Sequence, residues 1–228
     1  MQRKLYFNKD IEWLNAENNP PLAEKFTVLA DIQKEANSLL KGIDLEVKTG
    51  KPKGGVAKYS PQPLPGEVVI EPMPKDSEAE IKSLAGLEVS DRVIALTHEL
   101  RHVCDAFQKD DRQLKVGVRN MAPWEDLIHS EWRSHASQAK AAYEMLQKKF
   151  TIPSRHRQLL KVWDKNTFDV SKADVPQSMF DITRGYIRLY GKFTPTDQQV
   201  ENFIKSHQNW VDEAFSIFAP IDLQKDKI

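Results

Sequence analysis

The sequence has almost no cysteine, no surplus of either charge and no long apolar run. One cysteine, Cys104, stands among 228 residues, which excludes an intrachain disulfide and a zinc site made of several thiolates. Lysine and arginine together number 33, and so do aspartate and glutamate. Proteins that bind nucleic acid or anionic membranes usually carry a surplus of basic residues, which this sequence lacks. A helix that spans a bilayer needs roughly 18 consecutive apolar residues, and the sequence has no run of that length. We therefore expect no nucleic-acid partner and no integral membrane association.

The N-terminal segment also lacks the apolar core of a signal peptide, because residues 1–10 soon turn polar. This predicts a protein that is cytoplasmic where it is made, or one exported without a standard signal peptide. A chain of this length and composition can form one domain with a substantial core. We expect a single domain over 1–228, with an N-terminal helix and small sheet in 1–75 and the helical body in 76–228.

The spacing of apolar residues predicts an α+β fold that is mostly helical. A helical pattern follows the Pro20-Pro21 pair and ends near Gly42. Alternating apolar and polar residues then favour short strands at 43–48, 56–60 and 67–71. Together these elements predict a small N-terminal β-sheet packed on a helix, followed by a helical C-terminal half.

Helical periodicity continues almost to the end of the chain. Ser90 and Thr196 are suited to the N-cap position because a short side-chain oxygen accepts an N–H of the first turn. The expected helices cover 78–85, 91–107, 124–149, 155–163, 178–190 and 197–218.

The pattern that carries chemistry is His98-Glu99-x-x-His102, within the helix expected at 91–107. Residues i and i+4 on an α-helix lie about 40° apart, so both imidazoles can bind one metal ion. Glu99 lies about 100° round from His98, where it can act as general base on a water at the metal. The spacing is the H-E-x-x-H signature of zinc enzymes, and zinc is the cofactor that it predicts.

The neighbouring apolar residues support this interpretation. Leu96, Leu100 and Val103 cluster on the face opposite His98, so the helix would bury that face and present its histidines to a cleft. The alternative is a pair of surface histidines with an incidental glutamate.

Over residues 93–105, which include this motif, the sequence resembles the zincin metallopeptidases. The metzincin branch is excluded, because Asp105 and Gln108 occupy the positions where it requires glycine and histidine. Peptide deformylase shares the motif, but its upstream cysteine signature is missing. The gluzincin branch takes its third metal ligand from a glutamate on a later helix, and this resemblance implies Glu131 in that role.

Two other residues remain alternatives for the third ligand. His135 shares the helical stripe of Glu131 and Gln138, and it stands where gluzincins often have an aspartate that supports the site. Glu125 is the second alternative. His129 lies about 160° from Glu131 on the helix, so the two cannot both face one metal.

Other residues are candidates for orienting the metal ligands or stabilising the oxyanion. Asp105 falls on the histidine stripe, where a carboxylate could accept the free ring N–H of a ligand histidine. His135 is the second candidate for a supporting residue, because it stands where gluzincins often have an aspartate. Zincins stabilise the oxyanion with a residue from the C-terminal half, and Tyr186 is our first candidate for that role, with Tyr190 second. The resemblance also implies that the strand at 67–71 pairs with an extended substrate.

The sequence therefore predicts a zinc-dependent peptidase that acts on a protein or peptide substrate. His98, His102 and Glu131 would bind zinc, and Glu99 would be the general base. Small zincins without a signal peptide include bacterial effector and toxin proteases. The alternative is a non-enzymatic helical binding protein whose metal site is structural or degenerate.

Overall fold

A four-stranded mixed sheet forms the N-terminal part of the computed structural model, which describes residues 5–40, 43–61, 66–108, 124–163 and 177–218. The strands β1 (Leu5–Phe7), β2 (Leu45–Thr49), β3 (Ala57–Ser60) and β4 (Glu67–Ile70) have the order β1-β2-β4-β3. β1, β2 and β4 are parallel, whereas β3 is antiparallel to β4. Alternate residues such as Leu45, Val47, Val68 and Ile70 are fully buried, as expected for a sheet with one face on the core.

This strand order corrects one expectation about substrate binding. β4 covers most of the segment that we expected to pair with substrate, yet it lies between β2 and β3 and both of its edges are occupied. The antiparallel strand β3 is instead one of the two edge strands, with β1 at the other side of the sheet, and it contacts the helix that carries the histidine motif.

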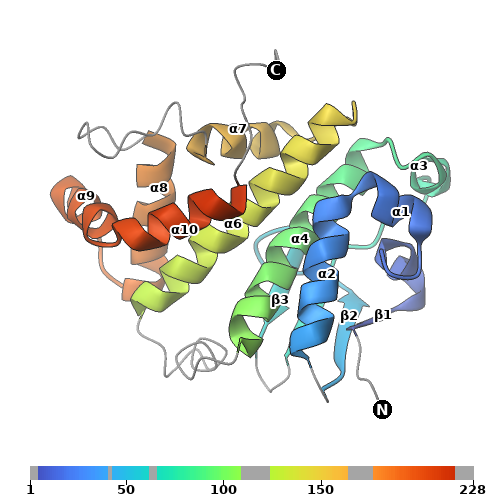
Figure 1. Ribbon diagram of the computed structural model, residues 1–228, viewed down its shortest axis with the longest axis horizontal. Helices are drawn as coiled ribbons and strands as arrows, with labels where there is room; N and C mark the ends of the chain where they lie inside the picture. The colour runs from blue at the N-terminus through green and yellow to red at the C-terminus, as the bar shows by residue number, and fades with distance from the viewer. Residues whose placement is uncertain (1–4, 41–42, 62–65, 109–123, 164–176, 219–228) are drawn as a thin grey trace.

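The helical part is built around two long helices. α4 (Leu87–Phe107) carries the histidine motif and lies between α2 (Thr27–Leu39) and α6 (Trp124–Gln147), as Figure 1 shows. α10 (Gln208–Phe218) crosses the outer side of α6. The other helical elements are η1 (Lys9–Leu14), α1 (Pro20–Lys25), α3 (Glu78–Ser83), α7 (Ser154–Trp163), α8 (Gln177–Tyr186), η3 (Ile187–Gly191) and α9 (Asp197–Ser206). The α+β, mostly helical class with its sheet packed against α4 is thereby confirmed.

Two expected helices are each divided by a residue whose backbone leaves the helical region. The segment that begins at Pro20 is divided at Phe26, whose φ of −129° and ψ of 68° leave the helical region. The Phe26 ring is buried and lies 5.0 Å from that of Phe150, so core packing accounts for the break. The last helix is divided at His207 in a similar way, with a φ of −112° and a ψ of 35°.

The two expected N-caps have different outcomes. Thr196 caps α9, because its side chain accepts the Gln199 N–H while the Gln199 side chain accepts the Thr196 N–H. Ser90 is not a cap: α4 begins three residues earlier, after Gly86, and Ser90 is buried inside the helix. No helix within the described residues has the length and apolar character that crossing a membrane requires.

Candidate metal centre

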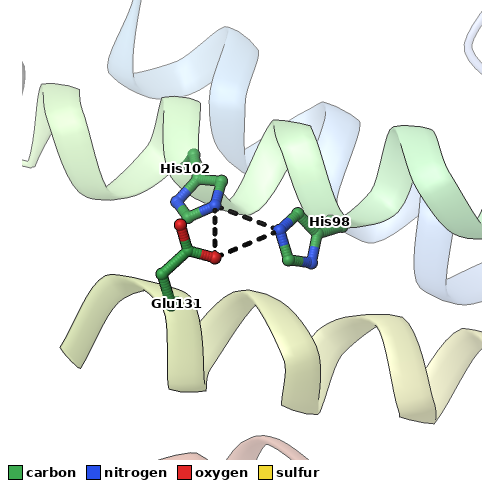
Figure 2. Close-up of side chains that lie close together, drawn as sticks. All are labelled: His98, His102 and Glu131. Carbon is green, nitrogen blue, oxygen red and sulfur yellow. Dashed lines mark hydrogen bonds and ion pairs between the residues drawn. The ribbon is translucent and has the colours of Figure 1, made fainter. Parts of the chain in front are cut away.

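Three side chains from α4 and α6 converge between the two helices. The Nε2 atoms of His98 and His102 lie 3.1 Å apart, and Glu131 Oε2 lies 3.6 Å from the first and 3.5 Å from the second. Figure 2 shows both imidazoles pointing from α4 toward the Glu131 carboxylate on α6. Among the residues that the structure describes, this is the one group of three such side chains arranged to hold a metal ion.

The triangle of ligand atoms has the dimensions of a tetrahedral metal site. With metal–ligand bonds of about 2.0–2.1 Å, the ligands of a tetrahedral ion lie about 3.3 Å from one another. The three observed separations, 3.1, 3.5 and 3.6 Å, bracket this value. Two imidazoles and one carboxylate are also a donor set used for divalent first-row metals. His98, His102 and Glu131 therefore fit a metal ion.

The electrostatics of the three groups are strongly coupled. Their side chains are only 12%, 17% and 10% exposed for His98, His102 and Glu131. Burial alone would lower the pKa of His102, but the Glu131 carboxylate outweighs burial and raises this pKa to about 9. Burial would likewise raise the pKa of Glu131, but His102 and His98 hold it well below its usual value. The pocket thus favours positive charge beside an ionised carboxylate.

Ser130 connects His102 to a buried carboxylate. The Nδ1 of His102 lies 2.9 Å from Ser130 Oγ, which donates to Asp105 Oδ2 at 2.8 Å. The Arg133 guanidinium lies 3.2 Å from the other oxygen of Asp105. Since the serine proton points at Asp105, Ser130 accepts the Nδ1–H of His102, so Nε2, which faces Glu131, is the nitrogen that can bind a metal once its proton is lost. Asp105 was expected beside His102, and the structure places one hydroxyl between them.

Gln138 supports His98, a contact that was not predicted from the sequence. Gln138 Oε1 lies 3.0 Å from His98 Nδ1 and 3.1 Å from His135 Nδ1. Its Nε2 lies 3.2 Å from His156 Nδ1, and His156 Nε2 lies 2.7 Å from Asp91 Oδ1. Gln138 shares one helical stripe of α6 with Glu131 and His135, and this spacing could have indicated from the sequence that Gln138 faces the site.

The alternative third ligands lie outside the triangle. The ring of His135 is centred 4.8 Å from that of His98, but its Nε2 lies 2.7 Å from the Tyr186 hydroxyl and its Nδ1 meets Gln138. Burial, followed by the nearby His98, lowers the pKa of His135 to about 3. Glu125 does not belong to the group. His129 turns away, with its Nε2 2.8 Å from Glu213 and its ring stacked on a tryptophan of α10.

Glu99 lies beside the triangle and contacts the edge strand. Its Oε2 accepts the Tyr59 N–H at 2.5 Å, so the outward side of β3 faces α4 at this point. Because one oxygen of the carboxylate is held by β3, the side chain has a fixed position next to His98 and His102.

Tyr186 and Tyr190 cover the triangle from the C-terminal half. α8 ends at Tyr186 and continues as the π-helical turn η3, whereas a single helix was expected over 178–190. The two rings stack in parallel with centroids 5.7 Å apart. The Tyr190 hydroxyl donates to Glu131 Oε1 at 2.5 Å, which leaves Oε2 toward the histidines. Burial, followed by the Glu131 carboxylate, raises the pKa of Tyr186 and keeps its hydroxyl protonated.

The site opens into two adjoining hollows that share His98, Glu99 and Tyr186 in their walls. The first, of about 680 Å³, continues past His102 and Tyr190. The second, of about 600 Å³, continues past the polar residues His135, Gln138 and His156. Comparisons with protein-family models, with curated protein sequences and with solved structures found no match for this chain. Its function must therefore be argued from the geometry of the site.

Proposed function

We propose that this chain is a zinc-dependent peptidase of the gluzincin type. The observation that carries the proposal is the convergence of His98, His102 and Glu131 beside Glu99 in an open cleft. Structural zinc sites are usually closed by four protein ligands, whereas catalytic sites keep the fourth position for water or substrate. Three converging ligands, with the nearby His135 nitrogens bonded elsewhere, favour a catalytic site.

Glu99 and Tyr186 are suited to the proton transfers of peptide hydrolysis. When bound, zinc supplies a Lewis acid that polarises the scissile carbonyl and acidifies water. Glu99 would take the proton of the attacking water and then pass it to the leaving amine nitrogen. Tyr186, which stays protonated, would turn its O–H from His135 Nε2 to the oxyanion that develops on the carbonyl.

The substrate in this proposal is an extended peptide that lies along the outer edge of β3. Val56 C=O bonds to Glu71 N–H on the inner side of the strand. Since backbone groups alternate along a strand, those of Ala57 and Tyr59 point outward into the cleft. Tyr59 N–H is held by Glu99, so a peptide would pair alongside Ala57, next to the reacting groups.

One observation favours the alternative, a non-enzymatic protein with a structural metal. The Glu99 carboxylate ties α4 to the sheet through Tyr59 N–H, and this contact alone would account for a glutamate at the position. The substitution Glu99→Gln separates the two functions, because an amide oxygen can still accept the Tyr59 N–H but cannot take a proton from water.

The experiment measures zinc content and peptide cleavage for the wild type, Glu99→Gln and His98→Ala. We expect about one zinc per wild-type chain, zinc retained and cleavage abolished in Glu99→Gln, and both lost in His98→Ala. Newly formed N-termini in a digested protein mixture, compared between wild type and Glu99→Gln, would identify the substrates. Zinc binding without any cleavage dependent on Glu99 would support the structural alternative, and a metal-free wild type would contradict both.

A further inference from the structure

Four polar side chains from three helices form an unbroken line that ends at His98. Asp91 lies on α4, His156 on α7 and Gln138 on α6. The successive separations are 2.7 Å from Asp91 Oδ1 to His156 Nε2, 3.2 Å from His156 Nδ1 to Gln138 Nε2, and 3.0 Å from Gln138 Oε1 to His98 Nδ1. We propose that this line fixes the tautomer of His98, with Gln138 as the positioning residue.

Asp91 is the carboxylate at the buried end of the line. Burial would raise the pKa of Asp91, but the hydrogen bond from His156 and the ion pair with Arg155 outweigh it and lower this pKa. An ionised carboxylate only accepts hydrogen bonds, so the proton between Asp91 and His156 is on His156 Nε2. In neutral His156 the other nitrogen, Nδ1, is then an acceptor.

The amide of Gln138 connects His156 to His98. Its NH₂ group must face the acceptor His156 Nδ1, which turns its carbonyl oxygen toward α4. That oxygen lies within hydrogen-bond distance of two imidazole nitrogens, His98 Nδ1 and His135 Nδ1. Since a carbonyl oxygen accepts and never donates, both nitrogens carry their proton.

The position of the His98 proton decides whether this residue can bind a metal. An imidazole with its proton on Nδ1 has its lone pair on Nε2, the atom of His98 that faces His102 and Glu131. A reversed amide would face its NH₂ toward His98, favour the lone pair on Nδ1 and place the proton on Nε2, where it would block a metal. The role of Gln138 therefore rests on the proposed metal site but does not require that the chain be a peptidase.

The experiment uses side-chain ¹⁵N NMR of histidine, which shows which ring nitrogen carries the proton, in the full-length protein. His98 signals are assigned as those missing from His98→Ala. In the metal-free wild type we expect the proton of His98 on Nδ1. In Gln138→Leu we expect a mixture of both tautomers and a zinc affinity that is about 10–100-fold weaker.

Two further variants test whether the amide oxygen matters rather than the volume of the side chain. Gln138→Glu keeps an acceptor for His98 Nδ1, so we expect it to retain the Nδ1–H tautomer and a zinc affinity near that of the wild type. Gln33→Leu is the matched control, because Gln33 is a fully buried glutamine with hydrogen bonds to Ala16 N–H and Asn15, away from the cleft. We expect it to lower stability and leave His98 and zinc affinity unchanged.

The proposal would be overturned if Gln138→Leu left the His98 tautomer unchanged, or weakened zinc binding no more than Gln33→Leu does. It would also be overturned if Gln138→Glu behaved like Gln138→Leu. A wild type that binds zinc but cleaves nothing would contradict only the peptidase function. The tautomer is measured without metal, so that result leaves the test of Gln138 intact.

Discussion

The two histidines of the motif lie one helical turn apart, yet they are supported in different ways. His102 reaches the Asp105 carboxylate through a single hydroxyl, and Arg133 and Glu213 extend this side as a network of charges. His98 meets a neutral amide, and its carboxylate, Asp91, lies two side chains further along.

Both arrangements leave the Nε2 atom of the histidine available to a metal. They differ in the interactions that keep each supporting group in place. The His102 side depends on complete pairing of buried charges, since an unpaired charge away from water is costly. The His98 side depends on the orientation of one amide, and its loss leaves a polar group unsatisfied but no uncompensated charge. We therefore expect the loss of a charged group on the His102 side to cost more stability than the loss of the amide on the His98 side.

The largest effect is expected from Arg133→Ala. The side chains of Arg133 and Asp105 are only 9% and 4% exposed, so the substitution leaves the Asp105 carboxylate buried without its cation. Breaking such a pair costs about 3–5 kcal/mol of unfolding free energy. Urea unfolding of the metal-free protein would measure this loss and compare it with that in Gln138→Leu, for which we expect a loss of about 1–3 kcal/mol of unfolding free energy. Equal losses would contradict the contrast between a charged and a neutral support.

The pH dependence of the metal-free protein should reflect the same charges. The pKa of His102 is about 9 in the folded protein against 6.5 ordinarily, so its stabilising effect is complete below pH 6.5 and is lost as the pH rises through 9. This amounts to up to about 3 kcal/mol. The pKa of His135 is lowered to about 3, so its protonation in the unfolded chain costs stability as the pH falls below 6.5. Unfolding free energy should therefore be greatest near pH 6.5.

Urea unfolding at pH 5, 6.5 and 9 would measure this dependence. His102→Gln should remove the loss between pH 6.5 and 9 and keep the loss on the acid side. A stability that rises steadily from pH 6.5 to 9 in the metal-free wild type would contradict the assignment to His102.

These supports also mark the limit of prediction from the sequence. His98, Glu99 and His102 were predictable because their spacing on one helix fixes their relative positions. The prediction of Glu131 needed in addition the resemblance to gluzincins and the helical stripe that Glu131 shares with His135 and Gln138. Ser130 was not predictable, because its place between His102 and Asp105 depends on how α4 packs on α6.

The contact between Asp91 and His156 and the order of the strands were also unpredictable, because both depend on how separate elements pack together. Asp91 stands seven residues before His98 on α4, a spacing that puts both on one face, but only the position of His156 on α7 connects them. Alternation of apolar residues identified three of the strands, yet it contains no information about their order in the sheet. The edge position of β3 therefore came from the structure.

A smaller effect is expected from Ser130→Ala, which removes the hydroxyl between His102 and Asp105. His102 would lose the acceptor that fixes its proton on Nδ1, and we expect zinc affinity to fall about 10–100-fold. Ser134→Ala is a close control, since Ser134 is buried one turn along α6 and its Oγ has no hydrogen-bond partner among the described residues. If the two variants bound zinc equally well, Ser130 would have no part in the site. A titration with a competing chelator gives both affinities.

The smallest effect is expected at the proposed third ligand, Glu131, whose supporting residue Tyr190 lies in η3. Tyr190 donates its O–H to Glu131 Oε1 from the π-helical turn, and its partly exposed position lets water replace it. We expect Tyr190→Phe to weaken zinc binding by no more than about tenfold, or about 1.4 kcal/mol. Leu189→Ala, at an exposed neighbour on the same turn, should leave the affinity unchanged. A loss in Tyr190→Phe larger than that in Ser130→Ala would mean that the carboxylate, rather than the paired histidines, is the part of the site most dependent on its support.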